Sequence, residues 1–424
     1  MRTLWICAAA AVALGAPPVT PPSAAQGAPG GTLPGGAQWH AEVPANWNGT
    51  LLLYSRGYSP NVGAPAAAPE AHREALLDAG YALAGSDYGA GGWALEQAVP
   101  AQRATVTAFA ERHGKPQRVI GWGFSMGGLV TTALAEQRDP VIDGGVAMCA
   151  SIGGAVGMMN MALDGAYAFR TLIAPDSDIR IVDIDDDRAN AARVAAALAR
   201  AMETHEGRAR VALAGVLAGI PGWTSADLPE PGAQDYAARV REIARSFVMG
   251  VFLPRVDQER RAGGVFSWNR GIDYRTQLAR SERRALVEVL YREAGLDLDA
   301  DLATLNAGPR VTAQPGAVRY MMANYTPDAR PRVPLVAVQL IGDGLTSPSL
   351  QRGYAEAAAG RGDVQSLWGR GAGHCRFDTA TVISAIRFVH ARLSSGEWGA
   401  RPDGFVDHTP PPMLRPCVRG GRCR

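Results

Sequence analysis

The feature that most constrains the fold is an alternation of short apolar segments with helical ones that stops in mid-chain and later resumes. Residues 38–149 alternate between expected strands and helices, and residues 334–394 return to the same pattern. Short apolar strands separated by helices are typical of a parallel sheet with helices on both faces. Residues 151–333 have a mainly helical pattern. We therefore expect one α/β domain that is interrupted by a large helical insertion.

The expected elements are short. Strands are expected over 39–43, 50–55, 81–86, 118–122, 142–149, 334–341 and 364–368. Helices are expected over 70–79, 95–113, 126–137, 349–359 and 379–393, and inside the insertion over 188–203, 234–248 and 281–293. The first two strands flank Asn48 and Gly49, and an Asn-Gly pair favours a tight hairpin turn. We therefore expect those two strands to pair with each other.

The amino terminus has the pattern of an export signal. Arg2 precedes an apolar stretch over 4–14, prolines interrupt residues 17–22, and small residues at 23–25 form a cleavage site. The stretch is too short to span a bilayer. Cys7 is a poor candidate for a lipoprotein cysteine because no apolar core precedes it. We expect a signal peptide over residues 1–25 and a secreted or periplasmic mature chain.

The composition excludes some classes of protein. Of the 424 residues, 47% are hydrophobic and 19% are charged, which excludes global disorder. The net charge of +2 argues against a nucleic-acid partner. The other long uncharged run, 146–163, contains several glycines and Asn160, so we expect buried core and no stable membrane insertion.

The chain is thus expected to have five parts. They are the signal peptide (1–25), the first part of the α/β core (26–150), a helical lid insertion (151–333), the second part of the core (334–396) and a tail (397–424). The tail is rich in Pro and Arg, and we assign it no structure.

The strongest motif lies between an expected strand and an expected helix. Residues 123–127 read Gly-Phe-Ser-Met-Gly, which matches the GxSxG nucleophile elbow around Ser125. Glycines two residues on either side let neighbouring backbone pack against the turn, and the following helix points its amides at the serine. A Gly-rich turn without chemistry is the alternative, and the flanking strand and helix disfavour it.

A nucleophilic serine needs a base and an orienting acid. His374 lies in a Gly-rich loop directly after the last expected strand, where its side chain can reach the sheet edge. The other histidines lie in helices, the first strand pair or the tail; they are His40, His72, His113, His205, His390 and His408. Asp343 ends the preceding strand, and its rivals are Asp363, at a strand start, and Asp378, a helix cap.

In these motifs the sequence resembles the α/β-hydrolase superfamily over about 38–149 and 334–394. The order Ser125, Asp343, His374 is the one found in that superfamily. The resemblance implies a mostly parallel eight-stranded sheet with an inserted lid, and it requires no cofactor. It also implies that the backbone amides of Met126 and, in the loop after an early strand, Tyr58 form the oxyanion hole. Many relatives have His-Gly where this chain has Arg56 and Gly57.

Four cysteines remain once Cys7 is removed with the signal peptide. An oxidising compartment permits two disulfides among them, with three connectivities, and no zinc-ligand spacing occurs, so no metal is expected. Cys375 after His374 resembles the tannase and feruloyl-esterase group, whose second cysteine directly precedes the serine. Here that residue is Phe124, and Cys149 is the substitute. We expect the pairs Cys149–Cys375 and Cys417–Cys423; the alternative is a buried free thiol at Cys149 and unpaired tail cysteines.

The remaining polar clusters have ordinary explanations. The acidic runs at 183–187 and 297–301 precede helices and are expected to cap them, without calcium. Met158, Met159 and Met161 are expected in the core or lining a pocket. Solvation is the expected state of three arginines near the site, Arg56, Arg370 and Arg376.

The function expected from the sequence is a secreted serine hydrolase that cleaves small-molecule or polymeric carboxylic esters. Ser125 would attack the acyl carbon, His374 would serve as base and then acid, and Asp343 would fix the imidazole. Two alternatives stay open: a peptidase of the prolyl-aminopeptidase kind, which uses the same triad, and a non-catalytic binding protein on the same fold.

Overall fold

The computed structural model of the chain describes residues 30–252, 254–421 and 423. A single sheet runs through these residues. The expected signal peptide, residues 1–25, and Cys7 lie outside the described residues. None of the helices in the described ranges is both long and apolar enough to cross a membrane. The mixed α/β class expected from the alternation is confirmed.

The described residues form a nine-stranded sheet in the order β1-β2-β4-β3-β5-β6-β7-β8-β9. The strands are Gly30–Thr32 (β1), Gln38–Glu42 (β2), Thr50–Ser55 (β3), Ala82–Ser86 (β4), Arg118–Phe124 (β5), Gly144–Met148 (β6), Leu335–Gly342 (β7), Val364–Ala372 (β8) and Phe405–Val406 (β9). All pairs from β4 to β8 are parallel, and β1, β2 and β9 add antiparallel pairs at the two edges.

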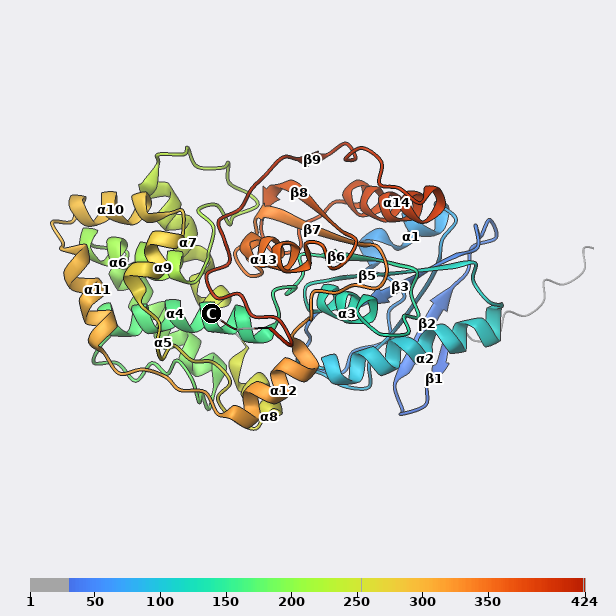
Figure 1. Cartoon of the computed structure of the whole chain (residues 1–424), viewed down its shortest axis with the longest axis horizontal. Coiled ribbons are helices and arrows are strands. Elements are labelled where there is room, and N and C mark those ends of the chain that lie inside the picture. The colour runs from blue at the N-terminus through green and yellow to red at the C-terminus, as the bar shows by residue number, and fades with distance from the viewer. Residues whose placement is uncertain (1–29, 253, 422, 424) are drawn as a thin grey trace, which may run out of the picture.

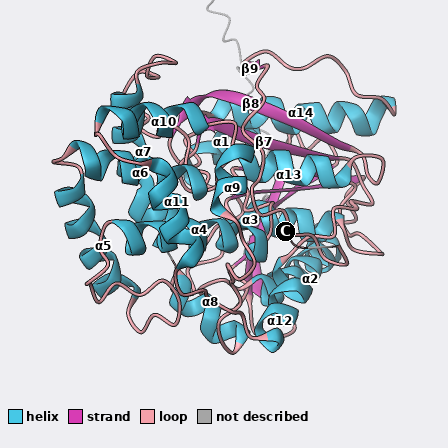
Figure 2. Cartoon of the chain, turned by 60° about the vertical axis from the view of Figure 1, so that its left-hand side comes forward, coloured by secondary structure: helices cyan, strands magenta, loops and turns pink. Residues whose placement is uncertain are grey.

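Helices cover both faces of this sheet, as the continuous burial of its central strands requires. Helices α1 (Glu70–Asp78) and α14 (Thr379–Ser395) pack on one face. Helices α2 (Leu95–His113), α3 (Met126–Ala135) and α13 (Pro348–Ala358) pack on the other. Figure 2 shows α14 and α13 on opposite sides of β7 and β8.

The chain between β6 and β7 forms a helical region with a core of its own. It contains Ala155–Leu172 (α4), Asp187–Ala201 (α5), His205–Leu217 (α6), Tyr236–Phe252 (α7), Arg255–Ala262 (α8), Tyr274–Arg280 (α9), Arg284–Glu293 (α10), Leu298–Ala307 (α11) and Pro315–Tyr325 (α12). Helices α4, α6, α7 and α10 share a buried apolar cluster that is separate from the two clusters on the sheet faces. In Figure 1 most of these helices lie together at one end of the molecule, beside the sheet.

Two expectations about the sheet are wrong. The two strands around Asn48 and Gly49 do not form a hairpin, because β4 lies between β2 and β3. Every residue of β3 is buried, so this strand needs neighbours on both edges and a helix on both faces, which a peripheral hairpin would not supply. The described sheet also has nine strands rather than eight. Neither β1 nor β9 is among the strand ranges that the sequence predicts, and β9 covers the outer edge of β8, where unpaired backbone groups would otherwise remain.

The tail, for which no structure is expected from the sequence, is packed along the molecule. After β9 it runs between the helical region and the sheet domain, as Figure 1 shows in red. Arg415 is fully buried and forms an ion pair with Asp164 of α4 at 2.8 Å. Met413 and Leu414 form a small apolar cluster with Met161 and Leu350. The tail therefore links α4 of the helical region to α13 of the sheet domain.

Candidate active site

Ser125 lies on a sharp turn between β5 and α3. Its backbone has φ 58° and ψ −122°, which is unusual for a residue other than glycine. A Cβ placed on Gly123 or on Gly127 would lie 2.4 Å or 1.9 Å from the carbonyl oxygen of Ser55 at the end of β3. Glycine is therefore required at both positions, because the turn packs directly on neighbouring backbone. This packing holds the serine at the carboxyl edge of the sheet.

His374 reaches the serine from the loop that follows β8. Its Nε2 lies 3.0 Å from Oγ of Ser125. The residues on either side, Gly373 and Cys375, have φ of 88° and 56°. This left-handed backbone turns the loop back over the sheet edge. The imidazole is partly buried, with 25% of the side chain exposed.

Asp343 completes the hydrogen-bonded series from the loop after β7. Its side chain is fully buried, and Nδ1 of His374 lies 2.9 Å from Oδ2 and 3.2 Å from Oδ1. The amides of Leu345 and Thr346 both donate to Oδ1. The hydroxyl of Thr346 lies 3.0 Å from Oδ2. These donors stabilise the ionised carboxylate and fix its orientation toward the histidine.

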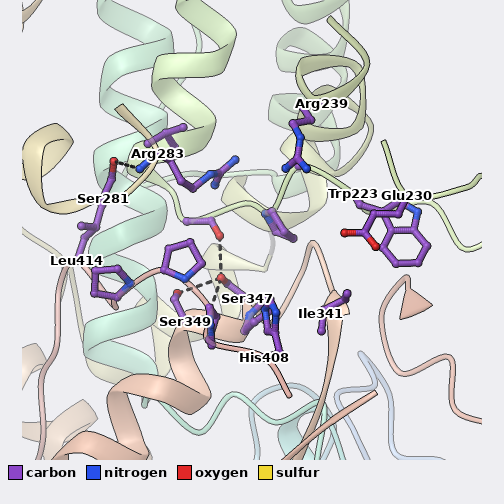
Figure 3. Close-up of a pocket in the computed structure, with 18 residues that line it drawn as sticks. Trp223, Glu230, Arg239, Ser281, Arg283, Ile341, Ser347, Ser349, His408 and Leu414 are labelled. Atoms are coloured by element: carbon purple, nitrogen blue, oxygen red, sulfur yellow. Dashed lines mark hydrogen bonds between the residues drawn. The ribbon is translucent and has the colours of Figure 1, made fainter. Parts of the chain in front are cut away.

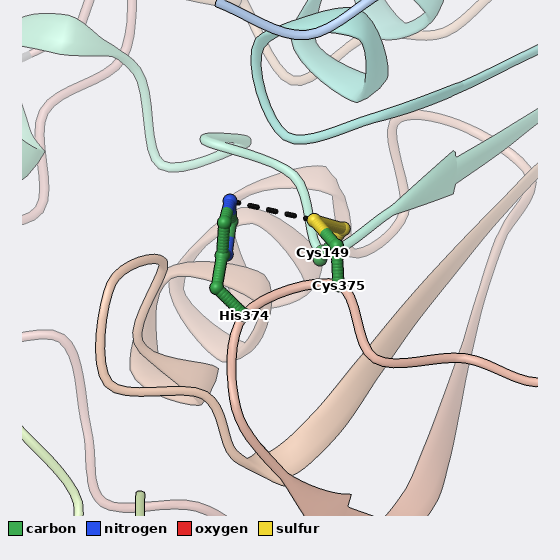
Figure 4. A group of neighbouring side chains, drawn as sticks. All are labelled: Cys149, His374 and Cys375. Atoms are coloured by element: carbon green, nitrogen blue, oxygen red, sulfur yellow. Dashed lines mark hydrogen bonds between the residues drawn. A yellow bond between two sulfur atoms is a disulfide. The ribbon is translucent and has the colours of Figure 1, made fainter. Parts of the chain in front are cut away.

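A disulfide joins Cys149, which follows β6, to Cys375 in the histidine loop. In Figure 4 this bond lies beside the imidazole of His374, and the Cys375 sulfur is 3.4 Å from Nε2. The ligand atoms of Cys149, His374 and Cys375 lie within 4.8 Å of one another. With both sulfurs in the disulfide, this group has no thiolate with which to bind a metal. The second expected disulfide, Cys417–Cys423, is also present.

The two expected oxyanion donors belong to segments that adjoin the serine. Met126 is the first residue of α3, where a backbone amide has no carbonyl partner within the helix. Tyr58 belongs to the loop after β3, and this loop lies against the serine: a Cβ on Gly57 would be 3.6 Å from Cβ of Ser125. The loop that carries Tyr58 and the first turn of α3 thus both adjoin Ser125.

Arg56 holds this loop in place. It is not the solvated side chain that the sequence predicts. Its guanidinium donates to the carbonyl oxygens of Gly57, Asp87 and Ala90. It also lies 4.5 Å from the ring centroid of Tyr88. The hydroxyl of Tyr88 in turn donates to the carbonyl of Arg56, and burial raises the pKa of this tyrosine, so it remains a protonated donor. Arg56 therefore positions the loop that carries Tyr58.

The rival residues lie elsewhere and have other partners. Asp363 accepts hydrogen bonds from Arg392 and from the indole of Trp398. Asp378 caps α14 through the amide of Thr381, and the expected role as a cap is confirmed. Three histidines have partners away from the serine, namely His72 with Thr379, His390 with Tyr81 and His408 with Trp368.

The acidic runs and Arg370, a second arginine near the site, also have identified partners. Asp186 and Asp297 cap α5 and α11 with their side chains, as expected. Arg370 forms an ion pair with Glu230. Met159 and Met161 are buried, as the expectation of core packing requires.

Sequence reasoning missed several polar groups that support the site. Thr346 lies beside Asp343, His374 and the carbonyl oxygen of Cys149. The only signal for it is the spacing of three residues from Asp343, which is compatible with an Asp-centred turn. Gln102 of α2 is buried and donates to both Tyr54 and Ser55 at the end of β3. No local pattern identifies that contact, because α2 and β3 are distant in sequence.

Comparison with known proteins identifies the family of this chain. No family model matches the chain. It is 31% identical over 414 residues to the o-phthalyl amidase of Xanthobacter agilis, and the match covers 88% of this chain and 89% of the amidase. The chain belongs to the same family as this amidase, within the α/β-hydrolase superfamily. It is therefore a hydrolase.

The chain is also similar to solved structures at low sequence identity. For an esterase of Pyrococcus furiosus the identity is 13% and the TM-score 0.39, covering 87% of this chain and 91% of the esterase. A proline iminopeptidase of Mycobacterium smegmatis has 13% identity and a TM-score of 0.39, covering 87% of this chain and 100% of that protein. An esterase of Aspergillus oryzae has 11% identity and a TM-score of 0.41, covering 88% and 81%.

Proposed function

We propose that this hydrolase acts through a Ser125–His374–Asp343 triad that forms an acyl-enzyme. The observation that supports this most directly is the continuous series of short contacts from the serine hydroxyl to a fully buried carboxylate. A nucleophile within reach of a base, with that base oriented by a third group, is the arrangement that acyl transfer requires.

In the proposed reaction Ser125 Oγ attacks the acyl carbon of the substrate and transfers its proton to Nε2 of His374. Asp343 keeps the proton of the imidazole on Nδ1 and stabilises the cation that forms. The amides of Met126 and Tyr58 would hold the oxyanion. His374 then gives its proton to the leaving group, and a water molecule activated by the same nitrogen hydrolyses the acyl-enzyme.

Carboxylic esters are the proposed substrates, and amides of small carboxylic acids are a second candidate. The triad can cleave either bond. The amide is favoured by the 31% identity to an amidase whose name specifies an o-phthalyl group. An aminopeptidase activity would need free carboxylates for the substrate amine. In the described helical region the buried carboxylates are already hydrogen-bonded to protein groups, so no observation favours that alternative. They are Asp164, Glu242, Asp257, Glu259 and Asp301.

Export from the cytoplasm is part of the proposal. Two disulfides among the described residues support an extracellular or periplasmic location, because such bonds persist in oxidising compartments. A signal peptide over residues 1–25 stays a prediction, which N-terminal sequencing of the exported protein would check.

The experiment that tests the proposal combines active-site labelling with a substrate panel. A fluorophosphonate should modify Ser125, located by peptide mass spectrometry, and Ser125→Ala should lose activity on the order of 10⁴-fold or more. The matched control is Ser151→Ala, a nearby buried serine whose hydroxyl has no role in the proposed reaction. The panel contains p-nitrophenyl esters of short and aromatic acids and the corresponding anilides. If Ser125→Ala kept more than a tenth of the activity, the proposal would be wrong.

A further inference from the structure

A pocket of about 180 Å³ lies between the helical region, the start of α13 and the tail (Figure 3). Its residues come from four segments far apart in the sequence, which are 216–239, 281–283, 341–349 and 408–414. The residues that line the pocket all lie in the described part of the chain, and Ser125, His374 and Asp343 are not among them. The pocket is thus separate from the proposed reaction centre, although the segment that follows Asp343 forms one of its walls.

Two arginines give this pocket a positive charge that the described residues leave unbalanced. Arg239 of α7 donates to the carbonyl oxygens of Pro231 and Gly232, and Arg283 donates to that of Ile220. Neither arginine forms an ion pair with a carboxylate among the described residues. Figure 3 shows the two guanidinium groups on the same wall of the pocket.

The Nη2 atom of Arg283 is buried and has no hydrogen-bond partner among the described residues. Burial, followed by the nearby charge of Arg239, lowers the pKa of Arg283 to about 10. A guanidinium held in this way is unfavourable unless an acceptor satisfies it, because a buried charge needs a partner. The side chain lines the pocket, so the acceptor can be an anion bound there.

Other groups in the pocket restrict the kind of anion. The acid that lines it, Glu230, is exposed and already paired with Arg370. The start of α13 lies opposite the arginines, with Ser347 as its N-cap, and the amino end of a helix favours negative charge. The remaining walls are largely apolar, with Trp223, Ile341 and Leu414. An apolar cavity of roughly 150 Å³ holds a benzene ring, so a single ring fits this volume.

We propose that this pocket binds a small organic carboxylate, whose charged group pairs with Arg283 and Arg239 while its apolar body lies against Trp223 and Leu414. A planar carboxylate can accept two parallel hydrogen bonds from a guanidinium, which matches the unpartnered Nη2 of Arg283. The proposal does not depend on the triad, since it concerns binding at a separate pocket.

The test measures binding of benzoate, benzamide and acetate by calorimetry to full-length mature Ser125→Ala protein, so that hydrolysis plays no part. Benzoate should bind more tightly than benzamide, which lacks the charge, and than acetate, which lacks the ring. Arg283→Gln and Arg239→Gln should each weaken benzoate binding at least about 10-fold. Arg241→Gln is the matched control, because Arg241 lies on the same helix as Arg239, is exposed and does not line the pocket.

A crystal soaked with 4-bromobenzoate should show anomalous bromine density between Trp223 and Arg283. This measurement and Arg239→Gln decide the matter if Arg283→Gln does not fold. Absence of benzoate binding, equal binding of benzamide, or unchanged affinity in both folded arginine variants would overturn the proposal. The same holds for a bromine at Ser125 alone. Each of these results is independent of whether Ser125→Ala abolishes hydrolysis, so failure of the two proposals can be distinguished.

Discussion

The Cys375 sulfur lies 3.4 Å from Nε2 of His374, the same nitrogen that lies 3.0 Å from Oγ of Ser125. Because Cys375 is bonded to Cys149 at the end of β6, the histidine loop is fixed to the strand next to that of the serine. The backbone of Cys149 and of Cys375 has positive φ, 42° and 56°, which is unfavourable for a residue with a side chain. The disulfide therefore holds two strained turns together beside the proposed base.

Removing this disulfide by Cys149→Ser should lower both stability and activity. The bond links residues 226 apart, and on the chain-entropy model its loss costs about 5 kcal/mol of unfolding free energy. Because the histidine loop loses its link to β6, kcat should fall even under conditions where the variant is folded. Urea unfolding and ester hydrolysis measure the two effects.

Cys423→Ser is the control, since the tail disulfide should affect stability but not kcat. Full kcat in folded Cys149→Ser would contradict the positioning role.

Thr346 is predicted to position the acid and base of the proposed triad. Its hydroxyl lies 3.0 Å from Oδ2 of Asp343 and 3.3 Å from Nδ1 of His374. Thr346→Val keeps the shape but removes the hydroxyl, and kcat/KM should fall about 10-fold, as for loss of a hydrogen bond to a charged group. The pH–rate profile should also move, because Asp343, the carboxylate that faces the imidazole, loses the hydroxyl beside its Oδ2. Thr346→Ser should restore both readouts, and a profile that stays unchanged in Thr346→Val would count against this role.

The elbow should not tolerate a side chain at Gly127. A Cβ there would lie 1.9 Å from the carbonyl oxygen of Ser55, and backbone cannot move away as a flexible side chain can. Gly127→Ala should therefore abolish hydrolysis and cost about 1–3 kcal/mol of stability or more. Gly399→Ala is the matched control, because a Cβ there meets no atom within 4 Å and the residue does not require positive φ. Activity and urea unfolding are the measurements. An active, stable Gly127→Ala would show that the turn is not packed in this way.

The sequence predicts the parts of this fold that depend on local pattern. The expected helices at 95–113 and 379–393 agree closely with α2 and α14, because their apolar spacing and ends are written in consecutive residues. The Ser125 turn could likewise be located, since strand, glycines and helix are contiguous. Strand pairing depends on distant residues, and so the local Asn-Gly signal gave the wrong partner for β3.

The contacts around the site were predictable only in part for the same reason. His374 and Asp343 follow strands directly, so chain order was enough to select them as candidates. Arg56 donates hydrogen bonds to the carbonyl oxygens of Asp87 and Ala90, which are more than 30 residues away in the sequence. The sequence therefore predicts only a solvated arginine at this position. The tail is rich in Pro and Arg, and its packing includes an ion pair with α4 and an apolar cluster that only the folded chain forms.

Glu136 should make stability depend on pH. Burial raises its pKa from 4.5 to about 7, in spite of hydrogen bonds from the Asp328 amide and the Tyr354 hydroxyl that lower it. The folded state then binds more protons than the unfolded state between these values. This stabilising contribution is complete below pH 4.5 and is lost as the pH rises through about 7.

Glu136→Gln should remove this dependence. The difference in unfolding free energy between parent and variant should change by on the order of 3 kcal/mol between the two pH values, with the parent losing stability as the pH rises. Urea unfolding at several pH values measures it. Glu111→Gln, at an exposed position on α2, is the control for loss of a carboxylate that is not buried. A pH dependence for Glu136→Gln no larger than that of this control would contradict the assignment.

The tail should be essential for stability because of Arg415. Its guanidinium is fully buried and pairs with Asp164, which also accepts a hydrogen bond from Tyr274. Arg415→Met leaves that carboxylate buried without its cation, which typically costs about 3–5 kcal/mol. Adding Asp164→Asn to Arg415→Met should recover part of the loss, because the uncompensated charge is then removed. Arg401→Met, whose side chain is 41% exposed and pairs with the exposed Asp407, should change stability far less, because water screens an exposed ion pair. Urea unfolding compares the four proteins. If Arg415→Met were as stable as Arg401→Met, the tail would be a passive covering of the surface and not a structural link between α4 and the sheet domain.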